Sequence, residues 1–265
     1  MTITDTTLLD FTGLSGQWDG PCEIVRCSRA LSPSGLPDMQ YALNPYGGCE
    51  HGCIYCYAPR TTHTDPSVWR VVRVKSNIVE RLAKELPAVE GIIGIGTVTD
   101  PYQAAERKFM LTRRCLELLL EKERTIHMHT KSDLIVRDID LLAEIKGITG
   151  ITITGLNDKV SKMTEPGAPL PEKRLEALRT LVDAGVNCYA LIAPVMSTVK
   201  GSERELMEAI AAAGVTKVYY GELHTRHYDS PRMNRLGIAP SPESEMLIRD
   251  IGRGLGIDIH DVFRG

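Results

Sequence analysis

Residues 44–58 of this 265-residue sequence read Asn44-Pro45-Tyr46-Gly47-Gly48-Cys49-Glu50-His51-Gly52-Cys53-Ile54-Tyr55-Cys56-Tyr57-Ala58. The stretch contains three cysteines, Cys49, Cys53 and Cys56, at the spacing C-x3-C-x2-C, with glycines before and between them. Cysteine thiolates at such close spacings hold iron–sulfur clusters. Three thiolates cannot saturate the four irons of a [4Fe–4S] cluster, so one iron would stay open to a substrate or a cofactor. The sequence therefore predicts a cluster with one open corner.

Zinc is the alternative occupant of this loop. A structural zinc ion takes four protein ligands, and His51 could be the fourth beside the three cysteines. However, His51 lies inside the same tight loop, and no C-x2-C or H-x3-H pair follows it in the sequence. Three buried thiols without a metal are less favoured, because the glycines and the polar pair Glu50-His51 are not typical of a core. The spacing favours the iron–sulfur interpretation over zinc.

The cysteine motif, with the aromatic Tyr55 directly before the last cysteine, resembles the signature of the radical S-adenosylmethionine (SAM) superfamily. The wider string NPYGGCEHGCIYCYAPR resembles the branch of that superfamily that contains spore photoproduct lyase. The resemblance implies that the open iron binds SAM and that the reduced cluster cleaves it, giving a 5′-deoxyadenosyl radical that abstracts hydrogen from a substrate. It also implies an electron donor such as a ferredoxin or flavodoxin. In such enzymes the cofactor carries the difficult chemistry, and the protein supplies orientation and exclusion.

Composition sets outer limits on the function. The net charge is −3 and the pI is near 6.2. The chain as a whole therefore lacks the basic excess typical of nucleic-acid-binding proteins, although a local basic patch is not excluded. No apolar run approaches the roughly 18 residues of a membrane span. The first residues, MTITDTTLLDFTG, have no basic or signal-like segment, so we expect a cytoplasmic protein.

The other four cysteines are scattered at Cys22, Cys27, Cys115 and Cys188. In a reducing compartment such cysteines are mostly small buried hydrophobic residues. Because no cysteine follows Cys188, a C-terminal auxiliary cluster is not expected.

The remaining chain alternates between strand and helix patterns. Strands are predicted at 39–43, 89–97, 125–130, 148–154, 187–193 and 216–220, and helices at 77–86, 103–122, 138–146, 171–185, 202–214 and 242–253. This alternation predicts a parallel sheet with helices outside it, as an open doubly wound sheet or a partial barrel. The resemblance points to the second of these, a partial (β/α)6 TIM-type barrel with a radical SAM core. We expect one domain over 41–265, preceded by an irregular lead-in or cap over 1–40.

Polar residues follow the predicted strands, where functional residues of such barrels gather. The segment HTKSD resembles the family's third-strand motif, whose lysine, here Lys131, binds the SAM carboxylate. The resemblance also places Thr154 near the methionine moiety and Tyr55 near adenine, and Arg174 would order the SAM loop by holding Glu165 or Asp158. The full set of residues expected to bind the cofactor is Tyr55, Thr97, Lys131, Ser132, Thr154, Arg174 and Met196.

The resemblance does not extend to one reaction. Spore photoproduct lyase uses a cysteine after the second strand as hydrogen donor, whereas no cysteine lies between Cys56 and Cys115 here. Thr99 and Asp100 are the candidates to replace that chemistry. His129, Tyr220, Glu222 and His224 are further candidates to line the barrel, and the substrate stays open. A lyase, isomerase or modifying enzyme is expected, with a nucleic-acid-modifying enzyme and a non-catalytic metal-binding module as alternatives.

Overall fold

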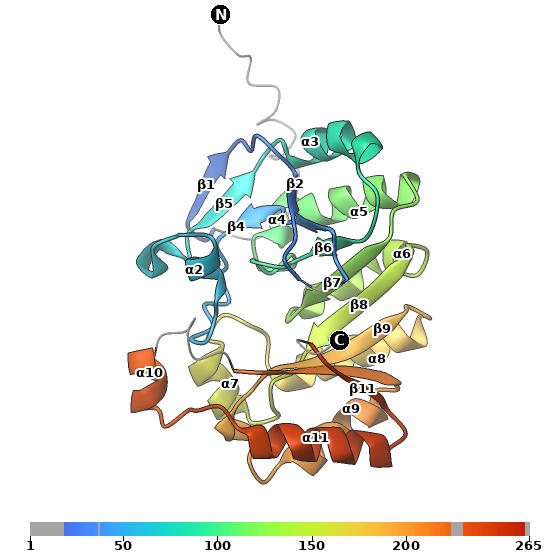
Figure 1. Cartoon of the computed structure of the whole chain (residues 1–265). Coiled ribbons are helices and arrows are strands. Elements are labelled where there is room, and N and C mark those ends of the chain that lie inside the picture. Colours follow the sequence, from blue (N-terminus) through green and yellow to red (C-terminus); the bar gives the residue numbers. More distant parts are fainter. Residues whose placement is uncertain (1–18, 37, 224–229, 263–265) are drawn as a thin grey trace, which may run out of the picture.

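The computed structural model describes residues 19–36, 38–223 and 230–262, and its centre is one twisted sheet (Figure 1). Seven of its strands, β3 and β6 to β11, run parallel to one another, and β2 lies antiparallel to β3 at one edge. In spatial order the strands are β2 (Leu31–Pro33), β3 (Tyr41–Leu43), β6 (Ile93–Ile95), β7 (Ile126–Thr130), β8 (Gly147–Thr152), β9 (Cys188–Val195), β10 (Lys217–Glu222) and β11 (Asp258–Asp261).

The six predicted strands overlap β3 and β6 to β10, and each lies beside the next one in the sequence. Within the described residues β2 and β11 each have one neighbour, so the sheet curves without closing. The expectation of a partial α/β barrel is confirmed. The strand β11 extends it at one edge, beside β10.

The helices are α2 (Ala58–Thr61), α3 (Ile78–Glu85), α4 (Glu106–Phe109), α5 (Leu111–Glu121), α6 (Ile139–Leu142), α7 (Asp158–Thr164), α8 (Pro171–Asp183), α9 (Glu203–Ala212), α10 (Ser230–Arg235) and α11 (Pro242–Gly254). Of these, α3, α5, α6, α8, α9 and α11 follow one another along the sheet, whereas α2 and α10 lie apart from it (Figure 1). Helix α8 packs on β8 and β9, and α11 packs on α9, β9 and β10. None of the helices in the described ranges has the length and apolar character needed to cross a membrane.

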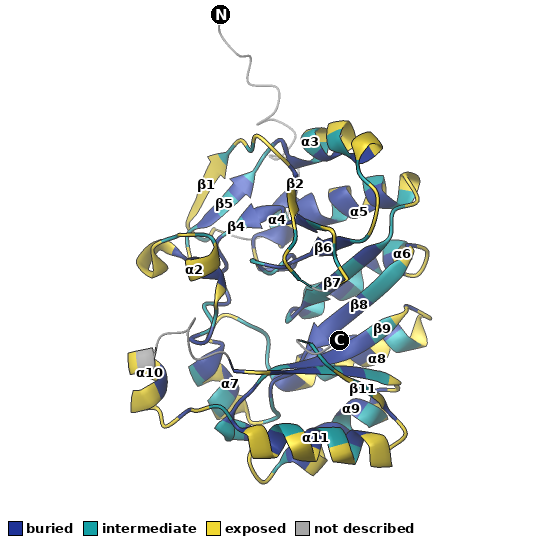
Figure 2. Cartoon of the chain, in the orientation of Figure 1, coloured by how far each residue is buried: buried dark blue, intermediate teal, exposed yellow. Residues whose placement is uncertain are grey.

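The core fills the space between these helices and one face of the sheet. Ile126 and Met128 of β7, Ile151 of β8 and Val218 of β10 are all buried there. Figure 2 shows the central strands in the colour of buried residues, while the outer sides of α3 and α11 are exposed. Strand β7, with the sequence Ile-His-Met-His-Thr, alternates between apolar and polar residues, and its apolar residues mark the face that the helices cover.

The helix predicted over 103–122 is in fact two helices, and that expectation was wrong. The chain breaks at Met110, which adopts the left-handed conformation with φ +50°. The carboxylate of Glu106 accepts hydrogen bonds from the backbone N–H groups of Thr112, at 2.9 Å, and Arg113, at 3.2 Å. Glu106 thereby satisfies the first amides of α5, which compensates for the broken helix.

Three local expectations also need correction. The helix predicted over 138–146 is only α6, preceded by a 3₁₀ segment at Asp133–Asp138. Helix α7 was not predicted; Asn157 caps it by accepting from the amides of Lys159 and Val160. The helix predicted over 202–214 is α9, which starts at Glu203; Ser202 does not cap it with its side chain, because its hydroxyl donates to the carbonyl of Val199 at 2.9 Å.

The described part of the predicted lead-in contributes two strands. One is β2, and the other is β1 (Cys22–Val25), which forms a three-stranded sheet with β5 (Val72–Lys75) and β4 (Tyr46–Gly47). Strand β4 lies directly before Cys49, and β5 follows the last cysteine in the sequence. Their antiparallel pairing brings the two ends of the cysteine segment side by side. This small sheet anchors the start of the cysteine loop.

Candidate active site

The cysteine loop runs from β4 to α2 and begins with a glycine that no other residue could replace without strain. Gly48 has φ +74°, and a β-carbon on it would lie 2.6 Å from the carbonyl oxygen of Trp69 and 2.7 Å from that of Val71. The next residue, Cys49, donates its N–H to the Trp69 carbonyl at 2.9 Å. The glycines noted in the sequence therefore allow the loop to lie directly on the segment that precedes β5.

The loop is also tied to the segment after β6. The carbonyl of Gly48 accepts from the hydroxyl of Thr99 at 2.5 Å and from the side-chain amide of Gln103 at 3.3 Å. The side-chain oxygen of Gln103 in turn accepts from the N–H of Glu50 at 2.9 Å. Gln103 is fully buried. Thr99 thus supports the loop that carries the cysteines.

The opposite side of the loop contacts the segment that follows β8. The N–H of Ile54 donates to the carbonyl of Thr164, and the N–H of Gly167 donates to the carbonyl of His51, both at 2.9 Å. The cysteine loop thus lies between the segment that follows β6 and the segment that follows β8. This arrangement places the loop across the carboxyl edge of the sheet.

The three thiols of the loop lie near one another in buried surroundings. Burial raises the pKa of all three, to about 12 for Cys53 and well above the usual range for Cys49. The charges of Cys53 and Cys56 also raise the pKa of Cys49, an effect that weakens with distance. Cys49 and Cys56 share an apolar cluster with Ala58 and Trp69.

This donor set fits a positively charged metal centre. A buried thiol with a raised pKa loses its proton only when a cation compensates the thiolate, as a coordinated metal does. A single zinc ion fits less well, because in the described part of the chain no three His, Cys, Asp or Glu side chains are arranged as ligands of one metal ion. His51, the fourth ligand in the zinc interpretation, faces Asp100 instead, with 3.3 Å between Nδ1 and Oδ2.

Asp100 connects the cysteine loop to the ends of β6 and β7. Its carboxylate accepts from the Thr130 hydroxyl at 2.6 Å and from the backbone N–H groups of Lys131 and Tyr102, both at 2.9 Å. Burial alone would raise its pKa, but His51 and these hydrogen bonds outweigh burial and lower it. Asp100 is therefore an ionised anchor in this conformation. Because the oxygens of Thr99 and Asp100 are engaged by the protein, their expected catalytic role stays a prediction.

Lys131, predicted to bind the SAM carboxylate, directs its side chain toward the cysteines. Its Nζ lies 5.5 Å from the centre of the Tyr55 ring. Its positive charge lowers the pKa of Cys53 and of Cys56, against the larger effect of burial. The structure thus brings Lys131 and Tyr55 together with the thiols, and their contacts with SAM stay predictions.

Glu165 stands at the centre of the other predicted residues. It pairs with Arg174, accepts a hydrogen bond from the Tyr55 hydroxyl and accepts another from the Thr154 hydroxyl at 2.9 Å. The expectation that Arg174 holds Glu165 or Asp158 is met by Glu165. Arg174 is only 1% exposed, so it acts on the site through Glu165 and not by touching a ligand.

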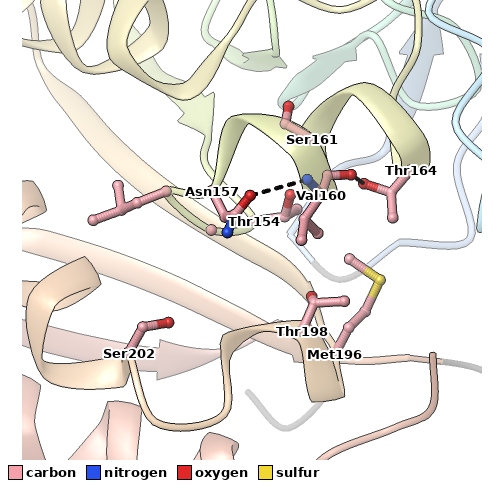
Figure 3. Close-up of a pocket in the computed structure, with 10 residues that line it drawn as sticks. Thr154, Asn157, Val160, Ser161, Thr164, Met196, Thr198 and Ser202 are labelled. Atoms are coloured by element: carbon pink, nitrogen blue, oxygen red, sulfur yellow. Dashed lines mark hydrogen bonds between the residues drawn. The ribbon is translucent and has the colours of Figure 1, made fainter. Parts of the chain in front are cut away.

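A pocket opens beside this group between the loops that follow β8 and β9 (Figure 3). It is lined by Thr154, Gly155, Leu156, Asn157, Val160, Ser161, Thr164, Met196, Thr198 and Ser202. Its lining is mainly hydroxyl groups with a few apolar side chains, and the buried Met196 is one of these. Thr154 and Met196 are therefore brought to one pocket, as their positions after adjacent strands predict.

Two other predicted binding residues have structural partners. The hydroxyl of Ser132 accepts from the Leu134 N–H at 3.2 Å and so caps the 3₁₀ segment that follows β7. The Thr97 hydroxyl accepts from the side-chain amide of Asn44 at 3.1 Å. Both lie at strand ends beside the loop, and their cofactor contacts stay predictions.

The face of the sheet opposite the helices carries rings. His127 contacts Tyr189 and Tyr219, with 2.9 Å between His127 Nε2 and the Tyr189 hydroxyl, and Tyr219 stacks on His260. His129 shares this face because strand side chains alternate. Burial, with the charges of His127 and Lys131, lowers the pKa of His129 to about 4. Tyr220 is buried on the other face and Glu222 is exposed, while His224 lies outside the described residues.

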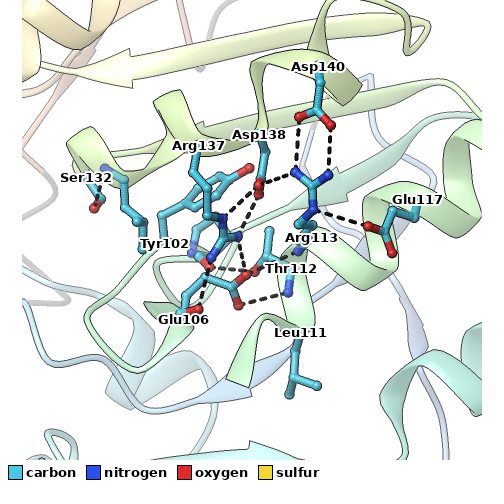
Figure 4. Close-up of polar contacts among 12 residues, drawn as sticks. Tyr102, Glu106, Leu111, Thr112, Arg113, Glu117, Ser132, Arg137, Asp138 and Asp140 are labelled. Atoms are coloured by element: carbon cyan, nitrogen blue, oxygen red, sulfur yellow. Dashed lines mark hydrogen bonds and ion pairs between the residues drawn. The ribbon is translucent and has the colours of Figure 1, made fainter. Parts of the chain in front are cut away.

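Sequence reasoning missed a second polar centre, built around Glu106 (Figure 4). Arg137 donates to Glu106 and to Asp138, each at 2.7 Å, and Arg113 donates to Asp138 at 2.9 Å. Tyr46, in the cysteine motif, donates its hydroxyl to Glu106. No spacing in the sequence relates Tyr46, Glu106 and Arg137. Glu165, by contrast, was named in the sequence analysis as a possible partner of Arg174.

Comparison with known proteins defines the class. The family model of the radical SAM superfamily matches residues 43–211, more than half of the chain, and the chain belongs to this superfamily of enzymes. An uncharacterized protein of Methanocaldococcus jannaschii is 33% identical over 177 residues, covering 65% of this chain and 66% of that protein. An uncharacterized protein of Mycobacterium tuberculosis is 32% identical over 224 residues, covering 76% of this chain and 65% of that protein. The chain therefore spans slightly less than two thirds of the length of these relatives.

Solved structures agree on the fold. A mutant of spore photoproduct lyase superposes with a TM-score of 0.67 at 16% identity, covering 91% of this chain and 82% of that one. SuiB of Streptococcus suis, bound to the precursor peptide SuiA, gives a TM-score of 0.58 at 12% identity, covering 85% of this chain and 49% of that one. The superfamily implies a [4Fe–4S] cluster and SAM.

Proposed function

We propose that this chain uses SAM and a [4Fe–4S] cluster held by Cys49, Cys53 and Cys56 to abstract hydrogen from a substrate. When bound, the cluster and SAM together supply reductive cleavage of SAM to a 5′-deoxyadenosyl radical. The observation that carries the proposal is the gathering of three cysteines, one buried and two partly buried, in one glycine-bounded loop at the carboxyl edge of a parallel sheet. Functional residues of barrel enzymes occupy that edge.

The residues around the loop match the chemistry of SAM. Lys131 offers an ammonium group to a carboxylate, and the Ser132 hydroxyl can donate to it, while the Thr154 hydroxyl can accept from an ammonium group. The Tyr55 ring and Met196 offer apolar surface to a flat base. Arg174 supports Tyr55 through Glu165, and Thr97 accepts from Asn44 at the start of the cysteine stretch. The chain's own contribution is thus to bind and orient the cofactor.

The loop is well placed to limit contact between the thiols and water. Trp69 and Ala58 cover Cys49, and Ile54, Tyr55 and Met196 form an apolar cluster against Cys53. A reactive radical must be kept from solvent, because a closed site prevents side reactions. One electron is needed for each reductive cleavage, so we propose a ferredoxin or flavodoxin as donor.

The test is anaerobic reconstitution with iron and sulfide. We expect near four irons per chain and release of 5′-deoxyadenosine when SAM and dithionite are added. Replacing Cys53 by Ala should abolish both, whereas replacing Cys115 by Ser should leave both, since Cys115 is a core residue on the buried side of α5, outside the cysteine loop. A reconstituted chain that holds its iron but never cleaves SAM would overturn the proposal. Zinc in the purified chain together with absent SAM binding would support the metal-binding module instead.

The solved neighbours differ in what they hold, and so leave the substrate class open. One structure of spore photoproduct lyase contains a dinucleoside spore photoproduct, and SuiB is bound to a peptide. The first favours a nucleotide or nucleic acid as the second candidate substrate. Binding of DNA or RNA that weakens steeply with added salt would support that candidate. A lyase, an isomerase and a modifying reaction remain the three reaction types proposed.

A further inference from the structure

Glu165 is a carboxylate in a place where an isolated charge is unfavourable. Its side chain has no exposed surface, and it directly follows α7, outside the cysteine motif. Burial raises its pKa, yet Arg174, Lys131 and the Tyr55 hydroxyl together lower it to about 2. Glu165 is therefore ionised, and its charge must be compensated by these neighbours.

Arg174 compensates Glu165 and is itself fixed. Besides the ion pair, its Nε donates to the carbonyl of Pro169 at 2.7 Å, and its Nη1 donates to the carbonyl of Thr152 at 3.3 Å. Thr152 is the last residue of β8, so the guanidinium is attached to the sheet itself. The pair is thus a rigid support at the carboxyl end of β8.

Two groups of the proposed site are attached to this support. The Tyr55 hydroxyl donates to Glu165, and Tyr55 lies between Cys53 and Cys56 in the sequence. The Lys131 ammonium is close enough to lower the pKa of Glu165 and lies over the Tyr55 ring at 5.5 Å. Counting formal charges, Arg174 and Lys131 give +2 and Glu165 gives −1, which leaves one positive charge beside the cysteines.

We propose that Glu165 is a positioning residue, which holds Tyr55 in the cysteine loop and directs the Lys131 ammonium toward the bound cofactor. Arg174 already neutralises Glu165, so the charge of Lys131 stays available for the carboxylate of an amino acid moiety. This role rests on the proposed function. Glu165 would not touch the cofactor itself. It would fix the positions of Tyr55 and Lys131, the two residues proposed to touch it.

The experiment measures SAM binding without turnover, by equilibrium dialysis of the anaerobically reconstituted chain in the absence of reductant. We expect Glu165→Gln to keep near four irons per chain but to weaken SAM binding about tenfold. In a Lys131→Met background the same Glu165→Gln change should weaken binding by a smaller factor, because the ammonium is gone and only the contact with Tyr55 is lost. Glu176→Gln on the exposed side of α8, where Glu176 pairs with Lys173, is the matched control and should bind SAM like the wild type.

Glu165→Gln leaves Arg174 without its buried partner, and the variant could fail to fold for that reason. A second pair of variants tests the proposal in that case. Tyr55→Phe removes the hydroxyl that donates to Glu165 and keeps the ring, and Glu165→Gln with Arg174→Gln removes both buried charges. Both should weaken SAM binding at full iron content and reduce the change that SAM causes in the electron paramagnetic resonance spectrum of the reduced cluster.

Two results would overturn the positioning role. One is SAM affinity within twofold of wild type in every folded, iron-loaded variant. The other is loss of iron in step with loss of thermal stability, with normal SAM affinity for the chains that stay loaded, since that is the behaviour of a purely structural pair. A wild-type chain that binds no SAM would instead overturn the proposed function itself.

Discussion

Gly167 lies so close to Glu50 that a β-carbon on Gly167 would be 2.1 Å from the Glu50 carbonyl oxygen. The obstacle is backbone, which cannot turn away as a flexible side chain can. We therefore expect Gly167→Ala to push the cysteine loop from the segment after α7, lowering the iron bound per chain by at least half and destabilising the fold by about 1–3 kcal/mol. Iron analysis and thermal unfolding of the reconstituted chain measure both effects.

The control for Gly167 is Gly254→Ala, at the end of α11, where a β-carbon meets nothing within 4 Å. That variant should retain its iron and its stability. Full iron loading and unchanged stability in Gly167→Ala would show that the two segments do not need this contact.

Glu106 should be the most sensitive carboxylate outside the candidate site. Its side chain has no exposed surface. Its carboxylate pairs with Arg137 and accepts hydrogen bonds from the Tyr46 hydroxyl and from backbone amides in the first turn of α5. Glu106→Gln leaves Arg137 with Asp138 as its remaining acid partner, so we expect a loss of about 3–5 kcal/mol in the free energy of unfolding. Urea denaturation measures it.

Glu117→Gln is the matched control for Glu106, because Glu117 pairs with Arg113 on the surface of α5, with 49% of its side chain exposed. We expect a change below about 0.5 kcal/mol there. Equal effects of the two substitutions would contradict the central role given to Glu106.

His129 should make stability depend on pH. Its pKa is lowered from 6.5 to about 4, so between these values the unfolded chain binds a proton that the folded chain does not. The free energy of unfolding should therefore fall as pH drops from 6.5 toward 4, by up to about 3 kcal/mol from this residue. Urea denaturation of the reduced, metal-free chain across that range measures the slope.

His129→Gln should have a flatter profile than the wild type over the same pH range, because its side chain does not titrate. The exposed His260, beside Asp258 on β11, provides His260→Gln as a comparison that keeps the slope due to His129. An equal slope in wild type and His129→Gln would exclude His129 as the cause.

The order of the sheet was predictable because it depends on patterns that repeat. Apolar strands separated by helix-length segments leave few ways to connect a parallel sheet, and the six predicted strands lie side by side in sequence order. The cysteine loop was predictable as a unit for a different reason, since its three cysteines lie within one short stretch. Lys131 and Thr154 were singled out through the family resemblance, and their contacts with a cofactor stay predictions.

What escaped prediction depends on contacts between distant segments. The break at Met110 is stabilised by Glu106, and that residue's other partners, Tyr46 and Arg137, lie far from it in the sequence. The pairing of β1 with β5 joins residues about fifty positions apart in two stretches of weak periodicity. Thr99 and Asp100 look like free polar residues in the sequence, and only the folded chain shows that Gly48 and His51 engage them.

The unclosed sheet has a consequence for how the cysteine loop is held in place. A sealed barrel is stiffened by strand pairing all the way round, whereas here, over the described residues, β2 and β11 are margins with a single neighbour each. The loop is therefore held by the hydrogen bonds that Gly48, His51 and Ile54 make with the segments after β6 and β8.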